Sequence, residues 1–202
     1  MDEMLKTTLR RDAETITASA IRAVLPDAAV QRALKGVRFP GRVILVAAGK
    51  AAWQMAHAAC AALETPVTQG IVITKYGHAR GALPRLRIVE AGHPIPDENS
   101  FSATRQAVEL VTGLTEHDTI LFLLSGGGSA LFELPLISGE ELQDITAQLM
   151  ACGADIVEIN TVRKRRYHPD GCRLHTNCDG RLRAGGQAAL RRREHGRCHR
   201  AL

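Results

Sequence analysis

Residues 119–131 decide the fold and read Thr-Ile-Leu-Phe-Leu-Leu-Ser-Gly-Gly-Gly-Ser-Ala-Leu. An apolar run that stops at a serine and three glycines predicts a buried strand that opens into a tight loop. Glycine has no Cβ, so the backbone of such a loop can approach a ligand closely. Successive N–H groups form an anion-binding concavity, and a helix that begins just after the loop adds its positive end. The stretch indicates a phosphate or carboxylate site at the carboxyl end of a strand, or else a tight turn without a ligand.

Short apolar runs alternate with helical patterns along most of the chain, which has 202 residues, 45% of them hydrophobic. Besides 119–124, strands are expected at 42–48, 70–74 and 87–90, and helices at 2–25, 26–34, 51–63, 97–111 and 138–152. Asp97 or Ser100 is expected to cap one helix, and Ser138 begins a capping box with Glu141. Strands that alternate with helices of this length indicate βαβ units. We therefore predict an α/β fold, a Rossmann-like three-layer αβα arrangement with a mostly parallel sheet.

The composition argues against two classes of protein. The sequence has no run near the roughly 18–20 apolar residues of a membrane span. Its first residues lack the basic and apolar regions of a secretory signal. Its five cysteines show no framework spacing, which favours reduced thiols over disulfides. We therefore expect a cytoplasmic protein with no membrane partner.

The net charge of +5 divides unevenly along the chain. Residues 165–202 hold ten arginines and three acidic residues, which gives +7, whereas residues 1–164 hold 16 basic and 18 acidic residues, which gives −2. The basic stretch shows neither helical nor strand periodicity, and its mixture of Arg, Cys, His and Gly is what out-of-frame reading of GC-rich DNA gives. We interpret it as an aberrant or disordered Arg-rich tail produced by a frameshift. A nucleic-acid arm is a weaker alternative, and a zinc site is weaker still because no CxxC pair is present.

Four motifs within residues 1–164 resemble the class II glycerate kinases, whose N-terminal α/β domain is followed by a domain called MOFRL. The motifs read AGKAAWQMA at 48–56, EAGHPIPDENS at 90–100, LSGGGSAL at 124–131 and NTVRK at 160–164. TKYGH at 74–78 is also similar, and the order and spacing of the motifs match those of the family. After Lys164 the family's His-Leu-Ser-like continuation is replaced by Arg165, Arg166 and Tyr167. The resemblance implies that residues 1–164 are part of the family's N-terminal domain, with the sheet incomplete at the C-terminus.

This resemblance implies phosphorylation of glycerate to 2-phosphoglycerate with ATP and Mg²⁺, by a kinase or by an N-terminal fragment whose own activity is in question. Phosphoryl transfer needs cradled phosphates, neutralised charge and an aligned acceptor. Lys50 follows a buried strand and Gly49, at the start of a helix, where its ammonium reaches a phosphate or a carboxylate unless it is simply solvated. The loop that is expected to bind the nucleotide phosphates or glycerate consists of Ser125, Gly126, Gly127, Gly128 and Ser129.

Three further groups are candidates for the site. His93 is expected to orient the acceptor or to accept its proton, or else to be held by its own loop. Asp97 is expected either to hold Mg²⁺ or, as we prefer, to cap a helix. The last group lies on one turn. There Arg163 is expected to clamp the glycerate carboxylate, and Asn160 and Lys164 are expected to bind the substrate. The alternative is that this turn is only a solvated basic surface.

Members of this family are also often named hydroxypyruvate reductases, so an NAD(P)H-dependent reductase is the alternative function. Against it, the loop at 125–129 lacks the GxGxxG pattern of dinucleotide-binding proteins. An inactive fragment whose basic tail binds nucleic acid is a third possibility, which we do not favour. The expected partner is a small-molecule substrate, glycerate. The chain could also form a homo-oligomer, because an incomplete sheet leaves an apolar edge and face uncovered.

Overall fold

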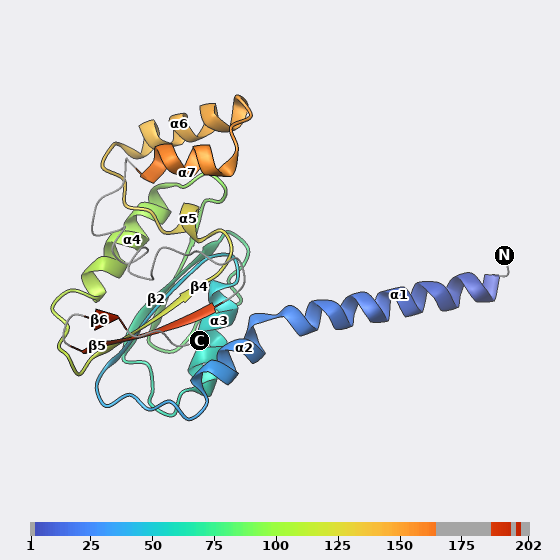
Figure 1. Ribbon diagram of the computed structural model, residues 1–202, viewed down its shortest axis with the longest axis horizontal. Coiled ribbons are helices and arrows are strands. Elements are labelled where there is room, and N and C mark those ends of the chain that lie inside the picture. The colour runs from blue at the N-terminus through green and yellow to red at the C-terminus, as the bar shows by residue number, and fades with distance from the viewer. Residues whose placement is uncertain (1–2, 165–186, 195–196, 199–202) are drawn as a thin grey trace.

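Four parallel strands form the centre of the computed structural model, which describes residues 3–164, 187–194 and 197–198 (Figure 1). In chain order the strands are β1 (Val43–Ala48), β2 (Gln69–Lys75), β3 (Leu86–Ala91) and β4 (Thr119–Leu124). Their order across the sheet is β3-β2-β1-β4, and each neighbouring pair is parallel. The α/β fold predicted from the alternation of strands and helices is confirmed.

Helices cover both faces of the parallel sheet, so all six residues of β1 are buried. Alternate side chains of a strand point to opposite faces, and those of β1 therefore divide between two hydrophobic cores. One core includes α2 (Pro26–Leu34) and α3 (Ala52–Ala62), and the other includes α4 (Glu98–Leu110) and α5 (Gly128–Leu131). The three predicted layers are therefore present, and they explain why β1 and β4 read as nearly continuous apolar runs.

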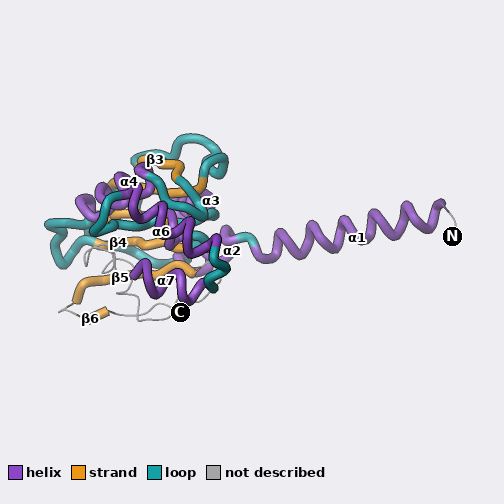
Figure 2. The backbone as a smooth tube through the Cα atoms, turned by 90° about the horizontal axis from the view of Figure 1, so that it is seen from above, coloured by secondary structure: helices purple, strands orange, loops and turns teal. Residues whose placement is uncertain are grey.

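Helix α1 (Glu3–Val24) extends away from the rest of the described chain (Figures 1 and 2). The predicted helix is confirmed, but its apolar stripe does not reach a core: Ile16 is 69% exposed and Val24 is 80% exposed. Periodicity predicts which side chains share a face of a helix, whereas what covers that face depends on the neighbouring elements. Within the described residues, no helix combines the length and the apolar character needed to cross a membrane.

Two helices, α6 (Gly139–Ala151) and α7 (Ile156–Lys164), pack on each other near the start of α4 (Figure 1). The side chain of Gln143 on α6 donates to the carbonyl oxygen of Pro96 over 2.9 Å. Leu142 on the same helix is fully buried. Helix α6 is thereby fixed to the segment that leads into α4.

The helix starts follow from the capping residues in the sequence. Asp97 is the N-cap of α4 and forms a reciprocal capping box with Ser100. Ser138 is the N-cap of α6, where its hydroxyl accepts from the backbone N–H of Glu141 over 3.2 Å. Each cap satisfies a donor that the first turn of a helix leaves without an internal partner. Both predicted helix starts are confirmed, and of the capping box predicted at Ser138 the structure shows the bond from the Glu141 N–H to the Ser138 hydroxyl.

The division of the chain after residue 164 stays a prediction. Most of the predicted tail, residues 165–186, 195–196 and 199–202, lies outside the described residues. Two strands of it are described, β5 (Gln187–Glu194) and β6 (Arg197–Cys198). Strand β5 runs antiparallel to β4, and β6 runs antiparallel to β5.

Candidate functional site

The carboxyl ends of the four parallel strands lie at one edge of the sheet, and a loop follows each of them. Strand β1 pairs with β2 on one side and with β4 on the other, so that Ala48 lies opposite both Ile73 and Leu124. The chain builds outward from β1 to β3 and then returns to the other side of β1. Ligands of open α/β sheets bind at such a switch point, outside the carboxyl ends of the strands. The loops after β1 and β4 are therefore where a site is expected.

Hydrogen bonds join these two loops directly. The backbone N–H of Lys50 donates to the carbonyl oxygen of Gly126 over 2.9 Å. The next N–H, that of Ala51, donates to the hydroxyl oxygen of Ser125 over 3.0 Å. The predicted glycine-rich loop and the predicted Lys50 loop are thus brought together, and Ser125 supports the start of α3.

Steric contact makes glycine necessary at two positions of the edge. Gly49 has φ +120°, and a Cβ on it would lie 2.3 Å from the Ser125 hydroxyl oxygen. Gly127 has φ +87°, and a Cβ there would lie 2.7 Å from Nε2 of His93 and 3.3 Å from Cγ of Lys50. Real Cβ atoms essentially never come within 3.0 Å of another heavy atom, and L side chains rarely adopt these φ values. Lys50, His93 and Gly127 therefore meet at one point.

The other residues of the glycine loop differ in what surrounds them. Gly126 is exposed, and the atom nearest to its missing Cβ is the Lys50 Cε, 4.0 Å away. Gly128 is buried, and a Cβ there would lie 2.5 Å from the Leu124 side chain. Gly127 is the N-cap of α5, and Ser129 belongs to that helix. The loop therefore faces outward at Gly126, while Gly128 lets the short helix pack on the sheet.

Positive charge surrounds His93. Partial burial lowers the pKa of His93, and the charges of Lys50, Lys75 and His78 lower it further. The ring is consequently neutral at pH 7, because its ordinary pKa of about 6.5 is already below that pH. A neutral imidazole beside two lysines can accept a proton from a hydroxyl group while the lysines attract an anion.

Asp97 is engaged by its own neighbours. Its Oδ2 accepts from the Tyr76 hydroxyl over 2.7 Å, and its Oδ1 accepts from the N–H and the hydroxyl of Ser100 over 3.0 and 3.2 Å. Burial alone would raise the pKa of Asp97, but the hydrogen bonds from Tyr76, Gly92 and Ser100 outweigh it and lower the pKa. Nowhere in the described part of the chain do three or more His, Cys, Asp or Glu side chains gather to hold a metal ion. Both oxygens of the Asp97 carboxylate thus already accept hydrogen bonds, and its role as a Mg²⁺ ligand stays a prediction.

No role was expected for Thr74, Lys75 or His78, although the segment resembled the glycerate kinases. Thr74 is fully buried and donates to the carbonyl oxygen of Gly49 over 3.1 Å. Nδ1 of His78 lies 2.9 Å from the carbonyl oxygen of Lys50. The signal in the sequence was available: carboxyl ends of adjacent parallel strands share an edge, so residues after β2 must lie beside residues after β1.

The last predicted group lies on α7, which packs on α6 and is not one of the four edge loops. Asn160 is half-buried on this helix. The side chains of Arg163 and Lys164 lie outside what the structure describes. Their proposed contacts with a substrate stay predictions.

The family model that matches residues 12–181 is described as a domain of unknown function, DUF4147, and the chain belongs to this family. It is 52% identical over 168 residues to the D-glycerate 2-kinase of Thermotoga maritima, an alignment that covers 82% of this chain and 40% of that protein. A crystal structure of glycerate kinase from the same organism covers 80% of this chain and 39% of its own, with a TM-score of 0.71. The resemblance to glycerate kinases seen in the motifs is confirmed.

A second name also occurs among the relatives. A protein of Agrobacterium vitis named as a putative hydroxypyruvate reductase is 44% identical over 126 residues, covering 61% of this chain and 28% of that protein. The chain thus spans about two fifths of the length of its Thermotoga relative, and less of this one. The activity of a whole relative is therefore a proposal for this chain.

Proposed function

We propose that this chain carries the phosphate-binding part of a kinase that transfers the γ-phosphoryl group of ATP to the 2-hydroxyl of glycerate. The observation that carries the proposal is the meeting of Lys50, His93 and Gly127 at the switch point of the sheet. The printed name of the 52% identical Thermotoga protein supports the choice of glycerate. The same geometry without that name would support an anion site only.

In the proposed reaction, the backbone of the glycine loop, which is exposed at Gly126, binds the nucleotide phosphates, and the Lys50 ammonium neutralises charge that develops during transfer. His93 accepts the proton of the attacking hydroxyl, because its lowered pKa keeps the ring neutral. Arg163, together with Asn160 and Lys164, is proposed to hold the glycerate carboxylate. Each group thereby orients a reactant or stabilises charge in the transition state, as phosphoryl transfer requires.

Mg²⁺ enters this proposal as part of the MgATP substrate. The carboxylate of Asp97 is committed to the helix cap and to Tyr76. Mg²⁺ keeps several waters and is often bound through substrate phosphates with few protein ligands. Asp97 is therefore proposed as a structural residue that fixes α4 beside the His93 loop.

Calorimetric titration of the 202-residue chain with MgATP and with glycerate tests the proposal. Both ligands are expected to bind, and Lys50→Ala is expected to weaken ATP binding roughly tenfold or more. Lys35→Ala is the matched control, because it removes an exposed lysine outside the four edge loops. Absence of ATP binding, or equal losses in the two variants, would show that the proposal is wrong.

Turnover assays distinguish the kinase activity from the reductase activity. ADP formation that depends on glycerate would support the kinase, whereas NADH oxidation that depends on hydroxypyruvate would support the reductase named in the Agrobacterium relative. In the kinase, His93→Asn is expected to lower kcat by roughly 10²–10⁴ with little change in KM. A change in KM alone would show that His93 takes no part in the chemical step.

We also propose a cytoplasmic location, where ATP is available and where free thiols such as Cys60 and Cys152 remain reduced.

A homo-oligomer is proposed because the exposed stripe of α1 would be covered by a second copy. Sedimentation at several concentrations tests this proposal, and a monomer at all of them would contradict it.

A further inference from the structure

The peptide groups around Lys50 are held from several directions. The N–H of Gly49 donates to the carbonyl oxygen of Ile73 over 3.1 Å, and the N–H of Lys50 donates to that of Gly126 over 2.9 Å. These bonds fix the backbone from which the Lys50 side chain extends. The other polar group of the Lys50 peptide, its carbonyl oxygen, contacts the segment that follows β2.

His78 supplies the short hydrogen bond to that oxygen. Its Nδ1 lies 2.9 Å from the Lys50 carbonyl oxygen, whereas the Thr74 hydroxyl lies 3.4 Å from the same atom and 3.1 Å from the carbonyl oxygen of Gly49. A carbonyl oxygen only accepts hydrogen bonds, so Nδ1 of His78 must carry a proton. The neutral ring is therefore the Nδ1–H tautomer, with Nε2 left as the acceptor nitrogen.

The turn that carries His78 is itself anchored. Its backbone N–H donates to the carbonyl oxygen of Lys75 over 3.0 Å, around Gly77 with φ +76°. The following N–H, that of Ala79, donates to the Glu90 carboxylate over 2.9 Å. A little further on, the indole N–H of Trp53 on α3 donates to the carbonyl oxygen of Gly81 over 2.8 Å. The imidazole thus extends from a fixed turn although its ring is exposed.

We propose that His78 is a positioning residue for Lys50: its Nδ1–H holds the Lys50 peptide so that the ammonium meets the phosphates beside Gly127. This rests on the proposed function, because Lys50 is taken there as the phosphate contact. His78 acts through Lys50 and need not touch the nucleotide. A substitution that keeps a donor at the place of Nδ1 should keep the effect, and one that removes the donor should lose it.

Nitrogen NMR of the imidazole rings tests the hydrogen bond without any ligand. In the neutral state His78 is expected to show a protonated Nδ1 and an unprotonated Nε2, whereas free histidine prefers the opposite arrangement. Assignment of the signal uses the His78→Asn variant, in which it disappears. A protonated Nε2 with a bare Nδ1 would overturn the proposal, since that ring cannot donate to Lys50.

Two substitutions test the consequence for binding. Asn places an amide N–H near the position of Nδ1, so His78→Asn is expected to keep ATP affinity within about twofold, and His78→Phe to weaken it about tenfold. His117→Ala is the matched control, because His117 is 77% exposed and precedes β4 at the opposite edge of the sheet. Thermal unfolding of each variant identifies any general loss of fold. Equal effects of Asn and Phe would overturn the proposal.

A double-mutant cycle decides whether His78 acts through Lys50. In the Lys50→Ala background, His78→Phe is expected to change ATP affinity by less than about twofold, because the group that it positions is gone. A tenfold loss that persists in that background would overturn the positioning role. If the unsubstituted chain binds no ATP, the proposed function fails, and the tautomer measurement still decides the hydrogen bond.

Discussion

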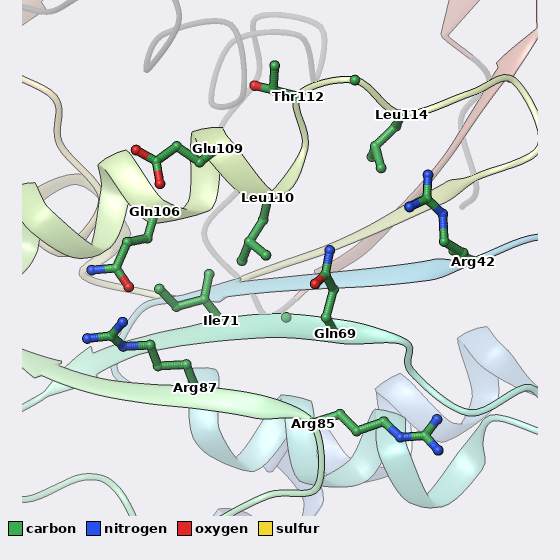
Figure 3. Close-up of a pocket in the computed structure, with 12 residues that line it drawn as sticks. Arg42, Gln69, Ile71, Arg85, Arg87, Gln106, Glu109, Leu110, Thr112 and Leu114 are labelled. Atoms are coloured by element: carbon green, nitrogen blue, oxygen red, sulfur yellow. The ribbon is translucent and has the colours of Figure 1, made fainter.

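The two edges of the parallel sheet differ in how their polar groups are used. At the carboxyl edge, Lys50, His93 and Gly127 come from three separate loops, and a Cβ on Gly127 would lie 2.7 Å from His93 and 3.3 Å from Lys50. At the amino edge lies a cavity of about 510 Å³ between the starts of β2 and β3 and the end of α4 (Figure 3). Its polar lining includes Arg42, Gln69, Arg85, Arg87, Gln106 and Glu109. With three arginines in its lining, the amino edge has the composition of an anion site.

The directions of the side chains reverse that impression. Figure 3 shows the guanidinium groups of Arg42, Arg85 and Arg87 pointing away from one another. Arg42 donates to both oxygens of Asp118 over 2.8 and 2.7 Å, and Arg85 donates to the carbonyl oxygen of Val67 over 3.3 Å. These two arginines are used by the chain itself. The candidate site is therefore identified by groups that converge on one point and not by the size of a cavity.

The largest expected effect that distinguishes the two edges comes from Gly127→Ala. The added methyl group would collide with the His93 ring and crowd Lys50 at 2.7 and 3.3 Å. Since both side chains must shift, ATP affinity is expected to fall roughly 100-fold. Calorimetric titration with MgATP measures the loss.

Gly113→Ala is the control for backbone strain. Gly113 lines the amino-edge cavity and has φ +71°, but a Cβ there would meet nothing within 4 Å. Both substitutions cost about 1–2 kcal/mol because an L residue is placed in the left-handed region. Only Gly127→Ala should lose ATP affinity, and a similar loss in Gly113→Ala would remove the distinction between the edges.

A smaller effect, on stability alone, is expected for Asp118→Asn at the amino edge. Hydrogen bonds from Arg42 and Thr115 hold the pKa of Asp118 well below its usual value. A carboxylate with a lowered folded pKa contributes stability above its unfolded pKa of about 3.9 and loses it as the pH falls through the folded value. The substitution is expected to lower the Tm at pH 7 by about 3–5 °C, less at pH 3, with unchanged ATP affinity. An equal shift at both pH values would contradict this.

The two edges also differ in their effect on the charge of His93. Partial burial, followed by the charges of Lys50, Lys75 and His78, lowers the pKa of His93. Lys50→Ala removes one of these charges and should raise the pKa, and bound inorganic phosphate should raise it as well. NMR titration of the His93 ring measures both shifts. Arg87→Ala at the amino edge is expected to leave the pKa of His93 unchanged.

The smallest effect is expected from Arg87→Ala on binding. Arg87 is an exposed residue of the edge strand β3 and lines the amino-edge cavity. Because Arg87 lies outside the carboxyl-edge loops, ATP affinity should stay within about twofold, and the free energy of unfolding should change by about 0.5 kcal/mol or less. A tenfold change would show that the cavity belongs to the nucleotide site.

Much of the carboxyl edge could be predicted from local sequence. The apolar run at 119–124 ends where the strand ends, and Asp97 with Ser100 forms a local box across three residues. That Lys50 and the glycine loop lie together follows from the rule for parallel strands. In each case the signal lies within a few residues, or in a general property of the fold.

The parts that could not be predicted depend on packing between distant residues. The bond of His78 to Lys50 joins residues 28 apart, and it depends on where the turn after β2 is fixed. Three consecutive glycines look equivalent in the sequence, yet Gly127 has the positive φ and Gly128 packs on Leu124. The exposure of α1 likewise depends on what lies beside it.

The hydrogen bonds around Lys50 have a consequence for amide exchange with solvent. The N–H groups of Gly49, Lys50 and Ala51 donate to Ile73, Gly126 and Ser125 respectively. These amides lie in a loop, but they can exchange only when β2, β4 or the glycine loop separates from β1. The Gly49 amide, whose acceptor lies in β2, should therefore take up deuterium nearly as slowly as β1 itself, while the Lys50 and Ala51 amides should exchange only as often as the glycine loop detaches.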